Sequence, residues 1–232
     1  MLACQVKFPL IHVRLVGNIG SGKSDLVEKI KKFTITPQLI IADEPMECME
    51  SHLRMIDSGR AFSPLTVQLG MLESIRRRDT SCLEACCASL HPPFRGGKVK
   101  IAHLLTVRGV EDVQSIFTRV NRIKGVMTQS DCSVVDAEIN VRGGIRPSQG
   151  LIWIACGELV EGDGYRARLS TRNQHGDKFA LNDPKYLSLI EREHLVEFAN
   201  FDGPKLRLEC DGDPDENCDK ALQFLRTLLT TC

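Results

Sequence analysis

Eight consecutive residues near the amino terminus have the types and spacing of a loop that binds phosphate. Segment 17–24 reads GNIGSGKS and matches the pattern G-x-x-x-x-G-K-[ST] at every fixed position. Glycines there let backbone N–H groups point at phosphate oxygens, and a helix beginning at the loop adds the positive end of its dipole. Lys23 would reach the outer phosphates, and Ser24 would offer its hydroxyl to Mg²⁺. The sequence therefore predicts a nucleoside triphosphate site made of Gly17, Asn18, Ile19, Gly20, Ser21, Gly22, Lys23 and Ser24.

The segments on both sides of this loop have the character that such a loop requires. Residues 11–16, IHVRLV, are rich in β-branched and apolar side chains and predict a strand entering the loop. Residues 22–33 carry apolar side chains at helical spacing and predict a helix leaving it. A strand, a glycine-rich loop and a helix in this order are the context in which the pattern binds phosphate.

Short apolar runs alternate with helical patterns along the rest of the chain, which predicts an α/β fold. Such alternation implies a parallel sheet flanked by helices, with ligands at the carboxyl ends of the strands. Residues 1–232 are predicted to form one P-loop kinase domain with a helical lid, and Pro and Gly mark loops at 90–97 and 142–150. The predicted strands are 11–16, 39–42, 98–105, 151–156 and 205–210, and the predicted helices are 22–33, 46–57, 64–79, 110–124, 184–200 and 214–229.

The composition of the chain limits which kinds of partner and which cellular setting are expected. Thirty basic residues balance thirty acidic ones, so charge gives no support for a nucleic-acid or membrane partner. The run Arg76-Arg77-Arg78 is interpreted as a solvated helix end. No apolar run approaches the roughly 18 residues of a membrane helix, and no targeting segment is evident. Ten scattered cysteines without a C-x-x-C pair favour a reduced, cytoplasmic chain without zinc.

The chain has the features of a small kinase rather than those of a GTPase. The D-x-x-G and N-K-x-D motifs of small GTPases are absent from the sequence. The predicted strand 39–42 leads into Asp43 and Glu44, which places a carboxylate at a strand end beside the phosphate loop. A kinase acting on a hydroxyl needs a proton acceptor there. Taken alone, Glu44-Pro45 is equally compatible with the start of a helix, where a negative charge is favourable.

These segments resemble the deoxynucleoside kinases, including the herpesvirus-type thymidine kinases. The loop GNIGSGKS is similar to their phosphate loop, and DEPMECM is similar to their Glu-Pro motif, with Met49 at its trailing aromatic position. The resemblance implies that Glu44 is the general base on the sugar 5′-hydroxyl. It also implies that Gln68, within TVQLGM, pairs with the pyrimidine edge and that Met71 packs against the ring. Without the family, Gln68 is compatible with a solvent-facing helix position.

The resemblance assigns the remaining site residues as well. The pair Val107-Arg108 matches an acidic-Arg pair of the family. Arg108 would therefore hold the carboxylate of the general base, Glu44, and the transferring phosphate. The segment GYRARLSTRNQHGD resembles the lid, here 164–178, and LECDGDPDEN resembles the loop on the adenine side. Two cations four residues apart on a helix repel unless an anion lies between them. The implied roles are base stacking for Phe117, phosphate binding for Arg168 and Arg172, and sugar 3′-hydroxyl binding for Asp177.

The chain departs from the family pattern at several of these positions. Val107 stands where an acidic residue helps to order the Mg²⁺ shell, and Met49 stands where a tryptophan is expected. Gln174 replaces a third lid arginine, Asp177 is shorter than the usual glutamate, and no tyrosine lies near Ile56.

The combined prediction is ATP- and Mg²⁺-dependent phosphorylation of a deoxyribonucleoside at its 5′-hydroxyl. Ile75 and Val113 are apolar where cytidine-preferring relatives carry an arginine and an aspartate, which favours thymidine. Two alternatives stay open: a nucleoside monophosphate kinase and a nucleotide-binding protein without catalysis. The expected partners are a nucleoside and a nucleoside triphosphate, with no nucleic acid or membrane, and a homodimer stays open.

Overall fold

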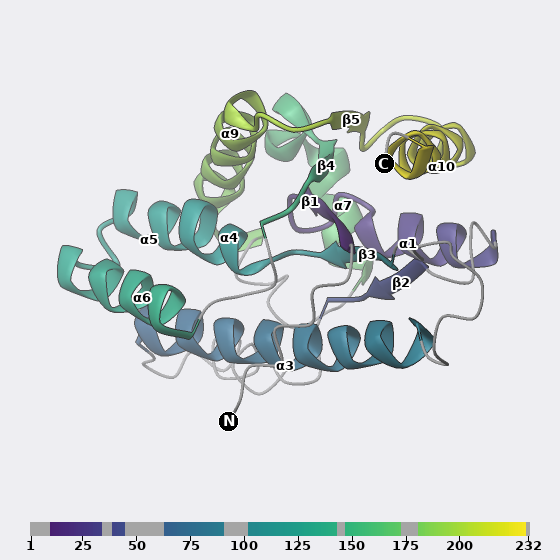
Figure 1. The fold of residues 1–232 in the computed structure, drawn as a ribbon. Coiled ribbons are helices and arrows are strands. Elements are labelled where there is room, and N and C mark those ends of the chain that lie inside the picture. The colour runs from purple at the N-terminus through teal and green to yellow at the C-terminus, as the bar shows by residue number, and fades with distance from the viewer. Residues whose placement is uncertain are drawn as a thin grey trace.

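A five-stranded parallel sheet forms the centre of the protein in a computed structural model (Figure 1). The structure describes residues 10–33, 39–44, 63–90, 102–142, 147–172 and 181–230. The strand order is β2-β3-β1-β4-β5, and every neighbouring pair is parallel. This confirms the predicted α/β fold with a parallel sheet flanked by helices. The strands are β1 (Leu10–Gly17), β2 (Leu39–Ala42), β3 (Ala102–Val107), β4 (Gly150–Ala155) and β5 (Lys205–Glu209).

The register brings the carboxyl ends of three strands together. The β1–β3 ladder runs to Leu15↔Val107, and the β2–β3 ladder runs to Ala42↔Thr106. Strand β3 lies between β1 and β2, so whatever follows these three strands is grouped at one edge of the sheet. The phosphate loop follows β1, Arg108 follows β3, and Asp43-Glu44 follows β2. Parallel α/β sheets bind ligands at this edge.

Each face of the sheet is buried by its own pair of helices. Helices α1 (Lys23–Lys32) and α10 (Pro214–Thr230) cover the face that carries Ile11, Val13 and Leu15. Helices α3 (Pro64–Leu90) and α9 (Pro184–Asn200) cover the opposite face. Figure 1 shows α3 running as one long helix past β2 and β3. All eight residues of β1 are buried, as expected for a strand that is covered on both faces.

A second apolar cluster is built mainly from helices. Residues of α3 pack against a π-helical segment, η1 (Val113–Thr118), and against α6 (Gln129–Arg142) and α9. The short elements around it are α4 (Val110–Asp112), α5 (Arg119–Ile123), the 3₁₀ helix η2 (Gly157–Glu161) and α7 (Asp163–Arg172). Among the residues that the structure describes, no helix combines the length and the apolar character needed to cross a membrane.

Several boundaries differ from the sequence predictions for physical reasons. Helix α3 continues to Leu90 instead of ending at 79, because neither Gly nor Pro interrupts 80–90. The predicted helix 110–124 is present, but its middle is a π-helix. Helix α6 was missed, although the Thr128 hydroxyl accepts from the backbone N–H of Asp131 while the Asp131 carboxylate accepts from that of Thr128. The predicted helix 46–57 lies outside the described residues.

Candidate active site

The phosphate loop has the backbone shape that its glycines permit. Gly20 and Gly22 have φ angles of 81° and 94°, in the left-handed region that favours glycine. A Cβ atom on Gly20 would lie 2.5 Å from Cδ2 of Leu169 in α7, so the loop and this helix are in close contact. Helix α1 begins at Lys23, directly after Gly22. The N-terminal end of its dipole therefore lies at the loop, where it would favour an anion.

The side chains of the loop divide into those that hold it and those that face a ligand. The Lys23 ammonium donates to the carbonyls of Gly17 (2.9 Å) and Asn18 (2.7 Å). The Asn18 amide is fully buried and donates to the Leu187 carbonyl (2.9 Å) and to Glu191 (3.3 Å). Asn18 thus anchors the loop to α9, a role that the motif itself does not specify. Ser24 is exposed at the first turn of α1, where its hydroxyl is accessible.

Glu44 and Arg108 form an ion pair across the ends of β2 and β3. Their side chains meet at 2.6 Å between Oε1 and Nη1, and both are largely buried. Arg108 has a φ angle of 58°, which costs a non-glycine residue about 1–2 kcal/mol. Its backbone N–H donates to the carbonyl of Leu15 in β1 (3.1 Å). The guanidinium carbon lies 4.9 Å from the centroid of the Phe117 ring. The structure therefore brings together three of the residues that the resemblance singled out.

A mostly apolar cluster of side chains lies beside this pair. Gln68, Met71 and Ile75 lie on one face of α3, at the spacing of one and two helical turns. Met71 and Ile75 share an apolar cluster with Val113 and Phe117. Gln68 is only 3% exposed, and its Oε1 has no hydrogen-bond partner among the described residues. The interpretation of Gln68 as a solvent-facing residue is wrong, and its unsatisfied acceptor suits a ligand that donates a hydrogen bond.

Helix α7 packs directly against the phosphate loop. The Tyr165 hydroxyl donates to the carbonyl of Ile19, and Leu169 contacts Gly20. Arg168 is exposed and donates weakly to the Cys210 carbonyl (3.3 Å), so its guanidinium lies at the end of β5. Arg172 is the last residue of α7, and its side chain is outside what the structure describes. Met49, Asp177 and the part of the lid at 173–178 also lie outside the described residues.

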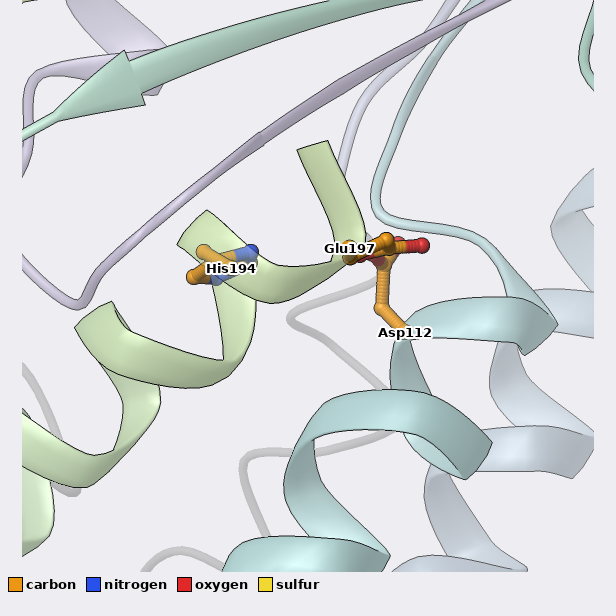
Figure 2. Close-up of side chains that lie close together, drawn as sticks. All are labelled: Asp112, His194 and Glu197. Carbon is orange, nitrogen blue, oxygen red and sulfur yellow. The ribbon is translucent and has the colours of Figure 1, made fainter. Parts of the chain in front are cut away.

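A buried ionic network lies beneath the site and was missed from the sequence. Arg14 in β1 pairs with Asp112 (2.9 Å) and with Glu197 in α9 (2.5 Å). Figure 2 shows Glu197 and His194 projecting from α9 toward Asp112, and their ligand atoms lie within 4.8 Å of one another. The signal in the sequence was a charged arginine inside a strand that is predicted to be buried. A buried charge needs partners, so Arg14 implied buried carboxylates.

Arg14 supplies the positive charge that faces the carboxylates of this network. Burial raises the pKa of Glu197 to about 7, and Asp112 adds to this while Arg14 opposes it. Burial also lowers the pKa of His194 well below its ordinary value, and Lys23, Arg108 and Arg14 lower it further, so His194 is neutral. Asp112, His194 and Glu197 have the chemistry of metal ligands, but the Arg14 guanidinium already pairs with both carboxylates. The network therefore joins β1, α4 and α9 under the phosphate loop.

Two further features correct or extend the sequence interpretation. The run 76–78 is not a solvated helix end: the side chains of Arg76 and Arg78 are 11% and 9% exposed, and only Arg77 is exposed at 71%. The departure at Val107 also has a structural meaning, because this side chain is 2% exposed and packs in the core beside α1. Val107 therefore does not face a ligand at the strand ends.

Comparison with known proteins gives structural relatives and no sequence relatives. No protein-family model matches the chain, and no curated protein matches its sequence. The fold is similar to that of deoxyadenosine kinase from M. mycoides. The complex with dCMP and dCDP gives a TM-score of 0.70 at 14% identity, over 94% of this chain and 100% of that one. The complex with dATP gives 0.65 at 15% identity, over 93% and 99%, and the complex with dCTP gives 0.65 at 14% identity, over 94% and 100%. At this identity the likeness establishes the fold.

Proposed function

We propose that this chain transfers the γ-phosphoryl group of ATP to the 5′-hydroxyl of a deoxyribonucleoside. The observation that carries the proposal is the Glu44–Arg108 pair at the ends of β2 and β3, next to the phosphate loop after β1. The solved structures of similar fold add support, since their proteins are named as deoxyadenosine kinases and were solved with deoxynucleotides bound. The site thus combines a triphosphate cradle with a carboxylate held by an arginine.

Each part of the site has a role in this reaction. The loop N–H groups and Lys23 bind the phosphates, which requires Lys23 to leave the carbonyls it now contacts. The Glu44 carboxylate accepts the proton of the 5′-hydroxyl as the oxygen attacks the γ-phosphorus and ADP leaves. Arg108 orients Glu44 and stabilises the transferring group, and its Nε–H has no partner among the described residues. Arg168 and Arg172 are proposed to close over the phosphates as part of a lid at 164–178.

Mg²⁺ fits the donor set that the chain offers. This ion keeps several waters and takes few protein ligands beside substrate phosphates, and the exposed Ser24 hydroxyl is a suitable one. When bound with the triphosphate, Mg²⁺ neutralises phosphate charge. Val107 cannot contribute to its shell, because its side chain lies in the core.

The proposed substrate is thymidine. Thymine presents an N3–H donor that suits the unsatisfied Oε1 of Gln68, while Met71 and Phe117 would pack on the ring. Ile75 and Val113 are apolar and buried, so neither position supplies a charge to an exocyclic amino group. Met49 and Asp177 complete the proposed contacts with the base and the sugar. The proposed setting is the cytoplasm.

A turnover assay with a panel of acceptors tests the proposal. We expect phosphorylation of thymidine with a higher kcat/KM than that of deoxycytidine, deoxyadenosine or deoxyguanosine. A higher kcat/KM for deoxycytidine or a purine nucleoside would contradict the proposed substrate but not the proposed reaction. Turnover of nucleoside monophosphates alone would favour a monophosphate kinase. Binding of ATP without any turnover would favour a nucleotide-binding protein without catalysis.

A further inference from the structure

The side chain of Arg78 bridges the ends of the two strands that carry Glu44 and Arg108. Its Nη1 donates to the carbonyls of Asp43 (3.1 Å) and Val107 (2.6 Å), and its Nη2 donates to the carbonyl of Arg108 (2.7 Å). The side chain is 9% exposed although it comes from the middle of α3. Residue 78 lies two turns beyond Met71, on the helix face that also carries Gln68 and Ile75.

These carbonyls lie at the point where the sheet stops holding the two strands together. The β2–β3 ladder ends at Ala42↔Thr106, so Asp43 and Val107 are the next residues in register. Beyond this point, among the residues that the structure describes, no strand ladder joins the two chain segments. The Arg78 guanidinium holds the two segments together instead. It binds Asp43, the residue before Glu44, and Val107, the residue before Arg108.

The donor set of Arg78 is completely used. A guanidinium has five N–H donors in a fixed planar arrangement. Three of the five go to the backbone carbonyls, and the other two, from Nε and Nη2, go to Oδ1 of Asp79 at 2.9 and 2.7 Å. Asp79 balances the buried charge and fixes the plane of the guanidinium. Lysine cannot reproduce this arrangement, because its three N–H donors are all on one nitrogen and cannot reach these separate acceptors together.

Arg78 also supports the unusual backbone of Arg108. The N–H of Arg108 is held by Leu15 in β1, and its carbonyl is held by Arg78 from α3. Arg108 lies in the left-handed region, and the two peptide groups that flank it are therefore held by two different elements, β1 and α3. This fixes the direction in which the Arg108 side chain leaves the backbone, toward Glu44 and Phe117.

We propose that Arg78 is a positioning residue for phosphoryl transfer, which sets the geometry of the Glu44–Arg108 pair through the backbone of both strand ends. The inference rests on the proposed function, because it assigns Arg78 a part in that reaction. It acts without touching the substrate. A displacement of a reacting group by about 1 Å can cost about 10²-fold in rate.

The test compares Arg78→Met with Arg77→Met, a matched control. Arg77 lies on the exposed side of the same helix and pairs with Glu73. We expect Arg78→Met to lower kcat by about 10–100-fold with little change in the KM for ATP, and Arg77→Met to leave kcat unchanged. Arg78→Lys should not restore kcat, because it cannot bind three carbonyls and Asp79 together. Equal kcat values for Arg78→Met and the natural protein would overturn the inference.

A double-mutant cycle separates positioning from general stability. In a Glu44→Gln background the pair no longer functions, so adding Arg78→Met should lower kcat much less than it does alone. Full additivity would contradict the inference. If Arg78→Met does not fold, Asp79→Asn tests the same point by loosening the guanidinium, with the same non-additivity expected. If the natural protein has no kinase activity, the proposed function fails; if it has activity that needs Glu44 but not Arg78, the inference alone fails.

Discussion

Glu44→Gln is the substitution that most sharply separates a catalytic carboxylate from a structural one. The change keeps the shape of the side chain and removes its ability to accept a proton. General base catalysis contributes about 10²–10⁴-fold, so we expect kcat to fall by that factor. This corresponds to about 3–5 kcal/mol of barrier. The KM for ATP should change little, because the phosphate loop after β1 is untouched.

The same substitution has a stability effect that must be measured beside the rate. Side chains 44 and 108 are 17% and 10% exposed, so loss of the negative charge leaves Arg108 poorly compensated. The expected cost is about 1–3 kcal/mol. For a chain of 232 residues each kcal/mol lowers Tm by about 2–4 °C, so the protein should stay folded at assay temperature.

Asp43→Asn supplies the control, because the Asp43 side chain is 54% exposed and pairs with Lys31 at the surface. Kinetics at 25 °C with melting curves for both variants distinguish the two roles. An unchanged kcat in Glu44→Gln would refute the reasoning and leave Glu44 as a structural partner of Arg108. Equal losses in both variants would refute it as well.

Three further substitutions test the phosphate loop, the proposed base contact and the buried ionic network. Lys23→Ala should abolish turnover in the kinase assay while circular dichroism stays unchanged, and near-normal activity would contradict the phosphate-loop assignment. Gln68→Leu should raise the KM for thymidine and leave Tm unchanged or higher, because it removes a buried acceptor without a described partner; an unchanged KM would place the base elsewhere. The pKa of Glu197 is raised from 4.5 to about 7, so the folded state holds a proton that the unfolded state has lost between these values. The free energy of unfolding should therefore fall as pH rises from about 4.5 to about 7, by about 3 kcal/mol at most, and Glu197→Gln should flatten that profile in urea titrations; an unchanged profile would contradict the raised pKa.

The sequence predicted those parts of the fold that local pattern determines. The strand at 39–42 and the helix at 184–200 were predicted with the bounds that the structure gives them. The alternation of apolar strands with amphipathic helices also predicted a parallel sheet, which is confirmed. The phosphate loop was recognisable because its chemistry depends on consecutive residues.

Contacts between distant segments could not be predicted in the same way. Arg78 resembles a surface arginine in a basic run, and only the packing of α3 against the ends of β2 and β3 shows that it is buried. Val107 was assigned by its place in a motif, whereas the alternation of side chains in β3 directs it into the core. The pairing of Glu44 with Arg108 followed from the family resemblance rather than from the residues themselves.

The central claim is that the ends of β1, β3 and β2 form one site for phosphoryl transfer to a nucleoside. The most direct test is to incubate the protein with ATP, Mg²⁺ and thymidine and to follow the phosphorus by ³¹P NMR, with Lys23→Ala in parallel. We expect equal amounts of ADP and of a monoester whose phosphorus couples to the 5′ protons of the sugar. No such product should form with Lys23→Ala. Release of inorganic phosphate without a nucleoside monoester, or no consumption of ATP by the natural protein, would contradict the claim.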